Sequence, residues 1–274
     1  MWTIVDSNHV QLSQKRMPNL CKLKPIINLD SMKLCLECGE ENLEIDLVNP
    51  NLERDGEVLT ISNHKSDVYG VDEGEQVADW LSRVLELTEK CRLVRLVERL
   101  NNNENESSGK RSSFAYKADY LLINQKSIEK IRTHLISELE MTIDNLKAID
   151  EYLYQQFRPN LVVDTLDNDD SSTALFDEEY WKEFRVVGTS LRFVVVENCS
   201  RCQMINIDQQ TNKPETMNKL SMLSKSLLKN LFKLKSNSKF GIYLSLNSEA
   251  DGTEMMIGSI GQAKFDNQKL DSLL

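Results

Sequence analysis

Between two predicted strands the chain reads Asn198-Cys199-Ser200-Arg201-Cys202-Gln203-Met204. Two of the six cysteines lie here, three positions apart, with an arginine directly before the second. The positive charge of Arg201 favours the thiolate form of a neighbouring cysteine, and a thiolate is both a nucleophile and a ligand for soft metals. The stretch therefore predicts a reactive thiol or a metal ligand at a turn between strands.

A second stretch, Phe157-Arg158-Pro159-Asn160, carries groups suited to a phosphorylated heterocycle. The guanidinium of Arg158 can bind a phosphate through two parallel hydrogen bonds, and the carboxamide of Asn160 both donates and accepts. Pro159 restrains the turn between them and has no amide hydrogen of its own. The alternative is a solvent-exposed arginine and a loop asparagine that bind nothing.

The cysteine spacing allows a zinc site but does not favour one. Cys35/Cys38 and Cys199/Cys202 both have C-x-x-C spacing, and four thiolates can hold zinc tetrahedrally. The two pairs are about 160 residues apart, whereas zinc sites of this kind have a gap of ~15–20 residues. Cys35 and Cys38 also lie in an alternating, strand-like segment, where side chains three positions apart face opposite sides. We expect reduced thiols, three of them small buried apolar residues: Cys21, Cys35 and Cys91.

Composition excludes several classes of protein. The chain has 274 residues, 40% of them hydrophobic and 28% charged, which is enough for a buried core in one large domain or two modest ones. Its formal net charge is −10, from 33 basic and 43 acidic residues, so a general nucleic-acid binder is not expected. No apolar run approaches the ~20 residues of a membrane span, and no secretory leader is present. We therefore expect a soluble, cytoplasmic protein without nucleic-acid or membrane partners.

Short alternating segments and a few helical ones are intermingled without βαβ regularity, and no phosphate-binding glycine loop occurs. A β-rich α+β fold is therefore expected. The predicted strands are Thr3–Asp6, Leu20–Ile27, Met32–Glu37, Asn42–Leu47, Glu57–Ser62, Cys91–Val97, Tyr120–Ile123, Leu161–Val163, Leu191–Glu197, Gln203–Asp208, Phe240–Leu246 and Met255–Ile260. The predicted helical segments are Gly74–Leu85, a long helix capped by Ser127 and continuing to Ile149, a turn at Glu178–Phe184, and the basic amphipathic Thr216–Leu234.

Three further features have unremarkable explanations. Ser62-Asn63-His64-Lys65 is similar to the run that carries the Schiff-base lysine of cysteine desulfurases, but its strand-rich surroundings offer no pyridoxal-phosphate cradle, so Lys65 is expected to be a solvated loop lysine. The adjacent acids Glu178 and Glu179 are expected to be solvated too. The lysine-rich stretch Leu223–Ser238 is expected to be an amphipathic surface helix, with partner docking as the alternative.

The stretch from Cys199 to Thr211 resembles the C-x-R-C-Q-M-x-x-I-D-Q-x-T signature of MOSC domains, specifically those in the C-terminal part of eukaryotic molybdenum cofactor sulfurases. Other stretches agree with that family in order along the chain. They are Trp2–Val5, Leu12–Lys15, Val71–Glu75, Trp80–Ser82, Tyr120–Asn124, Phe157–Asn160, Ser190–Phe193 and Phe240–Leu244.

The resemblance implies a fold and a domain organisation. We expect a MOSC-type β-barrel with flanking helices, plus an N-terminal β-barrel-like region that is truncated at its start. The expected parts are a MOSC N-terminal-type region over 1–98, a polar linker or insertion over 99–113, and the MOSC domain over 114–274. Family members have a Pro-Val-Lys-Ser segment and an Asp-Arg before the tryptophan that Trp2 matches. This chain starts after them, so we expect it to be the C-terminal part of a longer protein.

The resemblance also implies a function and its cofactors. In such sulfurases an N-terminal pyridoxal-phosphate domain takes sulfur from L-cysteine as a persulfide, and this sulfur replaces an oxo ligand of the molybdenum cofactor (molybdopterin). The product activates xanthine dehydrogenase and aldehyde oxidase. Here the expected partners are therefore a desulfurase domain, which this chain lacks, and those acceptor enzymes. The resemblance implies a sulfurtransferase activity for the longer protein of which this chain would be a part.

The resemblance further implies site residues. Cys202 matches a cysteine that binds molybdenum in related amidoxime-reducing proteins, so it is the expected catalytic residue and metal ligand. Arg158 and Asn160 match pterin contacts, and Arg201 is grouped with them as a cofactor-binding residue. Two alternatives remain, namely a stand-alone molybdenum oxidoreductase of the amidoxime-reducing type and a zinc-bound interaction module.

Overall fold

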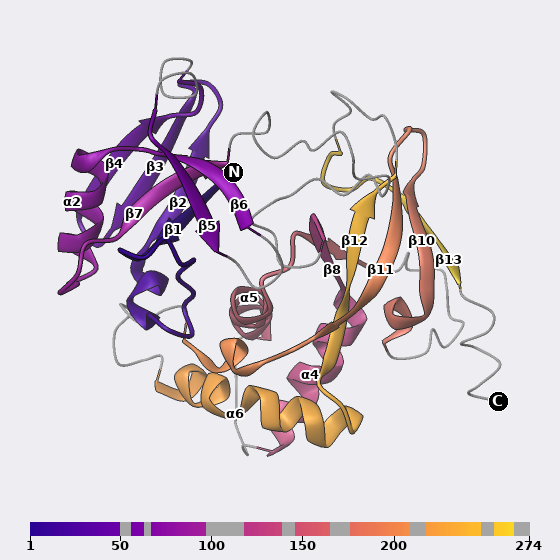
Figure 1. Cartoon of the computed structure of the whole chain (residues 1–274). Helices are drawn as coiled ribbons and strands as arrows, with labels where there is room; N and C mark the ends of the chain where they lie inside the picture. The colour runs from indigo at the N-terminus through magenta and orange to yellow at the C-terminus, as the bar shows by residue number, and fades with distance from the viewer. Residues whose placement is uncertain are drawn as a thin grey trace. The chain divides into compact units, whose positions relative to one another are not determined.

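The computed structural model describes residues 1–49, 56–62, 67–96, 118–138, 146–164, 176–208, 218–247 and 255–265. These residues form two compact units (Figure 1). Unit 1 comprises the described residues up to 96, and unit 2 comprises those from 118 onward. The predicted domain boundaries at 98/99 and 113/114 lie outside the described residues.

Unit 1 combines two antiparallel sheets with a helix. Its sheets have the strand orders β1-β7-β6-β5 and β2-β3-β4. The strands are β1 Trp2–Val5, β2 Lys24–Asn28, β3 Lys33–Cys38, β4 Glu41–Asp46, β5 Val58–Ser62, β6 Asp67–Asp72 and β7 Arg92–Leu96. The helices are the 3-10 helix η1, Pro18–Lys22, and α2, Glu75–Val84.

Helix α2 buries one apolar side against the sheets of unit 1. Val77, Trp80 and Leu81 are buried, in a cluster with Leu34 of β3 and Leu93 of β7. This spacing of three to four residues is the stripe that the sequence predicts. Burying such a stripe is what fixes a ten-residue helix, because helices this short are marginal alone.

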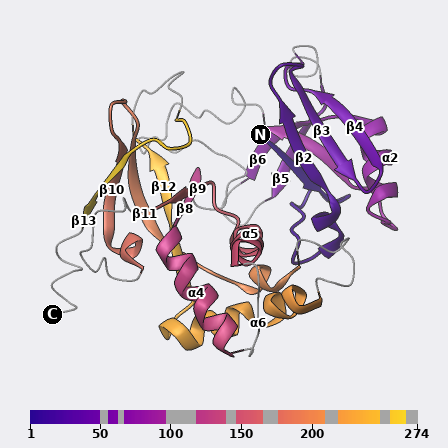
Figure 2. The ribbon, with the colours of Figure 1, turned by 180° about the vertical axis from the view of Figure 1, so that it is seen from behind.

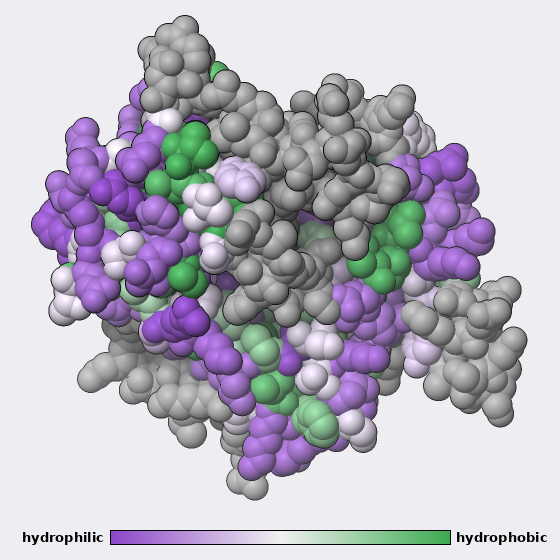
Figure 3. Space-filling view, in the orientation of Figure 1, coloured by the Kyte–Doolittle hydropathy of each residue, from purple (hydrophilic) through white to green (hydrophobic). Residues whose placement is uncertain are grey.

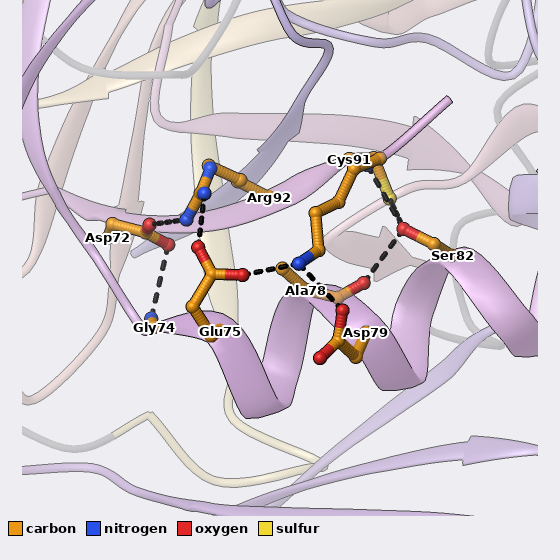
Figure 4. A network of polar contacts seen from close by, with 9 residues as sticks. Asp72, Gly74, Glu75, Ala78, Asp79, Ser82, Cys91 and Arg92 are labelled. Atoms are coloured by element: carbon orange, nitrogen blue, oxygen red, sulfur yellow. Dashed lines mark hydrogen bonds and ion pairs between the residues drawn. The ribbon is translucent and has the colours of Figure 1, made fainter.

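A network of charged side chains joins α2 to β6 and β7 (Figure 4). The carboxylate of Asp72 accepts a hydrogen bond from the Gly74 amide at 3.1 Å and pairs with Arg92. Glu75, in the first turn, pairs with Arg92 and with Lys90. A carboxylate at this end of a helix is also favoured by the helix dipole. The segment Val71–Glu75, which carries part of the family resemblance, thus has a structural role.

Unit 2 is built on a curled sheet of six described strands in the order β13-β10-β11-β12-β8-β9. Every pairing is antiparallel except that of β8 with β9. The strands are β8 Tyr120–Asn124, β9 Leu161–Val163, β10 Trp181–Val186, β11 Arg192–Ser200, β12 Lys239–Leu246 and β13 Gly261–Phe265. The helices are α4 Gln125–Glu138, α5 Leu146–Phe157, α6 Asn218–Lys235, η2 Asp177–Tyr180 and η3 Gln203–Asn206.

Helices α4, α5 and α6 pack together beside this sheet (Figures 1 and 2). Their shared core includes Ile123 of β8 and Phe240 of β12. Leu122, the neighbour of Ile123, belongs instead to a second cluster between strands of the sheet. Adjacent strand residues point to opposite faces, so β8 supplies side chains to both cores. The observed β-rich α+β architecture confirms the predicted fold class.

Several element predictions were wrong. The predicted long helix is two helices, α4 and α5, and Ser127 lies inside α4, where Asn124 instead accepts the Lys126 amide at 3.0 Å. The segment Gln203–Asn206 is a 3-10 helix and not a strand, because its hydrogen bonds close locally. The last strand is β13, later than predicted, and β6 was not predicted.

On the face drawn in Figure 3, hydrophilic side chains cover most of the described surface, and apolar ones form small separate patches. Among the described residues, no helix combines the length and the apolar character needed to cross a bilayer.

Candidate functional site

Cys202 lies at the point where the long strand β11 gives way to η3. Strand β11 pairs with β12 through two register shifts, at Val195/Glu197 and at Asn198/Ser200. Such bulges twist a strand and redirect the residues that follow it. Cys199 is 3% exposed, whereas Cys202 is exposed at the N-terminus of η3. Of the two cysteines in the signature, Cys202 is the one that an external molecule can reach.

The side chain of Arg201, unlike that of the exposed Cys202, points into unit 2. Its Nε and Nη1 donate to the carbonyl oxygens of Phe240 and Phe157, each at 2.8 Å. Its backbone amide donates to the Ser238 carbonyl, also at 2.8 Å. The guanidinium carbon lies 5.1 Å from the ring centroid of Phe157 and 5.5 Å from that of Phe240. Arg201 therefore connects the signature to α5 and to β12.

Arg158 directly follows the last residue of α5. Its φ of 56° ends the helix in the left-handed region, and its amide donates to the Tyr154 carbonyl at 2.7 Å. A left-handed residue in this position is a common way to stop a helix, although it is unfavourable for a non-glycine residue. The side chain of Arg158 is exposed. This placement suits a residue that binds an anion from solution.

Asn160 forms a two-way link to β8. Its backbone N–H donates to the Leu121 carbonyl, and its side-chain Oδ1 accepts from the Leu121 backbone N–H, each at 2.8 Å. The carboxamide oxygen is thus used within the fold, which leaves its NH₂ group as the donor with which the exposed Asn160 could meet a ligand. The sequence indicated a side chain that both donates and accepts. In the structure its acceptor oxygen is occupied by the backbone N–H of Leu121.

The two predicted stretches, some 40 residues apart in sequence, meet in space. Arg201, next to Cys202, bonds to the carbonyl of Phe157, next to Arg158. Gln156, 1% exposed, adds a second link: oriented with its NH₂ toward η3, it donates to the carbonyls of Ile207 at 2.7 Å and Ile205 at 3.1 Å. Sequence spacing does not reveal Gln156, because a glutamine inside a helix is usually solvent-exposed.

Cys35 and Cys38 do not have the geometry of a metal-chelating pair. All six cysteines are described, and none forms a disulfide. Cys38 packs against the apolar cluster of unit 1 with its Sγ 3.7 Å from the Val84 carbonyl, whereas Cys35 alternates to the other face of β3. The predicted divergence is thus observed. No cluster of three or more His, Cys, Asp or Glu side chains suited to a metal occurs within the described ranges. Cys21 and Cys91 are buried as expected, but Cys35 is only half-buried.

Three adjacent acids of η2 are buried, contrary to the prediction that Glu178 and Glu179 are solvated. Glu178 is 0% exposed, and it accepts a hydrogen bond from Ser127 Oγ at 2.8 Å. Burial raises the pKa of Glu178 to about 7 and that of Asp177 to about 6. Glu179 pairs with Lys235 at 2.6 Å, and burial lowers the pKa of Lys235. Helix α6 is therefore fixed through its last turn, which the sequence alone did not indicate.

Two family models match the chain. The MOSC N-terminal beta barrel domain matches residues 1–88, and the MOSC domain matches residues 109–258, more than half of the chain. The chain belongs to the MOSC domain family. Within the second match, the MOSC region contains Arg158, Asn160, Arg201 and Cys202.

Three similar proteins share the name molybdenum cofactor sulfurase. The molybdenum cofactor sulfurase of Danio rerio is 30% identical over 95% of this chain and 30% of its own length. Those of Bos taurus and Homo sapiens are also 30% identical, over 89% and 77% of this chain but 26% and 23% of their own lengths. The chain therefore spans less than a third of these relatives. A solution structure from Bordetella bronchiseptica overlaps 39% of the chain with 20% identity and a TM-score of 0.31, too little to define the fold.

Proposed function

We propose that this chain is the molybdenum-cofactor-binding part of a molybdenum cofactor sulfurase. The observation that carries the proposal is that Cys202 and Arg158 are both exposed and that their sequence neighbours, Arg201 and Phe157, are joined by a hydrogen bond. A soft thiolate and an anion-binding arginine at one place suit a molybdenum centre on a phosphorylated pterin. The names of the relatives support the same assignment.

The residues present fit this group. Cys202 would bind molybdenum or accept sulfur through its thiolate, and Arg158 would hold the phosphate. Asn160 would donate its NH₂ group to the edge of the pterin, since its oxygen already accepts from Leu121. The cofactor, as the substrate of the proposed reaction, supplies the metal whose oxo ligand sulfur replaces. The chain's own residues bind and orient it.

We propose that the remaining steps are carried out by other parts of a longer protein, as the length of the relatives suggests. We propose that a pyridoxal-phosphate desulfurase domain takes sulfur from L-cysteine as a persulfide, and that xanthine dehydrogenase and aldehyde oxidase use the sulfurated cofactor. We propose the cytoplasm as the location. Residues 1–98, 99–113 and 114–274 stand as the proposed N-terminal region, linker and MOSC domain.

The test is molybdopterin retention by the chain, expressed alone and with its upstream sequence. The pterin is released after purification and measured by its fluorescence. Replacement of Cys202 by Ala should reduce molybdenum per chain strongly, because no second thiol ligand is exposed in the signature. Cys35→Ala, which removes a half-buried thiol of unit 1, is the matched control. Equal losses in the two variants would contradict the role of Cys202, and absence of pterin from both expressed forms would contradict the proposed function.

A further inference from the structure

The guanidinium of Arg201 is enclosed by protein. Its Nη2 is inaccessible to solvent and has no hydrogen-bond partner among the described residues. The group packs against the rings of Phe157 and Phe240, whose centroids are 4.4 Å apart. A cation against aromatic rings is stabilised by the charge distribution of the rings. In this conformation Nη2 of Arg201 is not open to a phosphate in solution.

The two carbonyl groups that Arg201 binds belong to different elements. Phe157 ends α5, directly before Arg158, and Phe240 lies on β12, which pairs with β11. The arginine fork presents its donors in one fixed plane, so it holds both carbonyls at a set separation. With Cys202 as its direct neighbour, Arg201 therefore couples the position of the thiol to the turn Arg158–Asn160.

The backbone of β12 makes room for this contact. Gly241 has a φ of +74°, and a Cβ at this position would lie 2.7 Å from the Leu122 carbonyl oxygen and 3.3 Å from Arg201 Nη2. A side chain there would have to displace the backbone of β8 or the guanidinium. Both the conformation and the space therefore favour glycine where Arg201 crosses the strand.

From these contacts we propose that Arg201 is a positioning residue, which places Cys202 and Arg158 together and does not contact the cofactor. The identity of the ligand rests on the proposed function, whereas the positioning rests on the contacts of Arg201 alone. The role differs from the direct cofactor contact that the family resemblance implies for Arg201.

Hydrogen exchange tests the positioning without any ligand. Arg201→Lys keeps the positive charge but replaces the fork by one ammonium group, so at least one carbonyl bond is lost. The amides of Arg158 and Asn160, which donate to Tyr154 and Leu121, should then exchange about tenfold faster. The control is Arg95→Lys in unit 1, because Arg95 also donates to two carbonyls and lies over the ring of Trp2. Unchanged exchange at these amides in Arg201→Lys, or an equal increase in Arg95→Lys, would overturn the proposal.

A pair of glycine variants provides an independent test. Gly241→Ala should accelerate the same amides, because its Cβ displaces the guanidinium or the β8 backbone. Gly188→Ala is the matched control: its φ is +79°, yet a Cβ there would meet nothing within 4 Å. The two variants share the conformational cost and differ in the steric contact. Equal exchange at residues 158 and 160 in both variants would contradict the coupling.

A double-mutant cycle on pterin retention distinguishes positioning from direct contact. If Arg201 acts through Arg158, then Arg201→Lys should reduce retention in the wild-type background but add little to Arg158→Ala. Additive losses would show that Arg201 contacts the cofactor, and would overturn the proposal. If even the unmodified chain retains no pterin, the proposed function fails, and the two exchange experiments still decide whether Arg201 positions the turn.

Discussion

At the scale of single residues, Asn160 separates folding from binding. Its Oδ1 accepts the buried Leu121 amide, so Asn160→Ala should lower the free energy of unfolding by about 1–3 kcal/mol. Asn160→Asp keeps an acceptor but loses the NH₂ donor and adds a negative charge. It should therefore unfold near the wild-type denaturant concentration while retaining less molybdopterin. Chemical denaturation and pterin fluorescence measure the two effects, and full pterin retention by Asn160→Asp would contradict the donor role.

Glu178 should make stability depend on pH. Its pKa is raised from 4.5 to about 7 by burial, so the folded chain holds this proton at pH values where the unfolded chain has released it. The free energy of unfolding should therefore fall as pH rises from about 4.5 to about 7, on the order of 3 kcal/mol in total. Glu178→Gln should remove this part of the fall, whereas exposed Glu151→Gln should not. The free energy of unfolding is measured by urea titration at each pH. If it varies with pH in the same way in wild type and in Glu178→Gln, Glu178 is not the source of the fall.

The same residues show what a sequence can predict at this scale. The sequence singles out Cys202 and Arg158 as candidates because thiol and guanidinium chemistry is a property of the side chain itself. The contacts of Arg201 and Glu178 were not predicted, because they are made with groups distant in sequence. The Arg201 partners, Phe157 and Phe240, lie 44 and 39 positions away, and Ser127 lies 51 positions from Glu178.

At the scale of elements, periodicity predicted the presence of most helices and strands but not the conformation of the segments that connect them. The apolar spacing of α2 and the alternation of β3 each have one buried face, and both were located correctly. The segment Gln203–Asn206 is short, and the Ile205 amide bonds to the Cys202 carbonyl at 3.2 Å, so a local turn replaces strand pairing. A few apolar residues in such a run do not distinguish the two conformations.

Helix α6 shows why a lysine-rich stretch is not uniformly a solvated face. Lys235 is 5% exposed and pairs with the buried Glu179, whereas Lys233 is 48% exposed and pairs with Glu138. Lys235→Met should lower the free energy of unfolding by about 3 kcal/mol, because it leaves a buried carboxylate unpaired. Lys233→Met, a change of the same shape on the same helix, should cost less than about 1 kcal/mol. Equal midpoints of urea unfolding for the two variants would refute this distinction.

At the scale of the whole molecule, the fold class follows from composition and pattern, because it is a sum over many residues. The membership of the hydrophobic core clusters of each unit could not be predicted from the sequence. Leu122 and Ile123, adjacent on β8, belong to different cores of unit 2. Their assignment depends on which face of a curled sheet the helices cover, and that is a property of the complete unit.

The six cysteines report on both units at once, and their order of reaction with a thiol reagent can be predicted. Cys202 is exposed and should react first. Cys35 and Cys38 are half-buried and should follow, because desolvation raises the pKa of both thiols and so reduces the thiolate fraction. The remaining three are 8% exposed or less and should react only as the chain unfolds: Cys21, Cys91 and Cys199.

Native thiol titration with a chromogenic disulfide, with and without denaturant, measures these classes. Cys202→Ala should remove the fast phase and leave the other two unchanged, since Cys202 occupies an exposed turn. If the fast phase persists in Cys202→Ala, another thiol is the accessible one. Rapid reaction of Cys199 in the native chain would mean that the strand end opens in solution. The link from Arg201 to the Phe157 carbonyl should keep that end closed, so Arg201→Lys should be the variant in which Cys199 first becomes reactive.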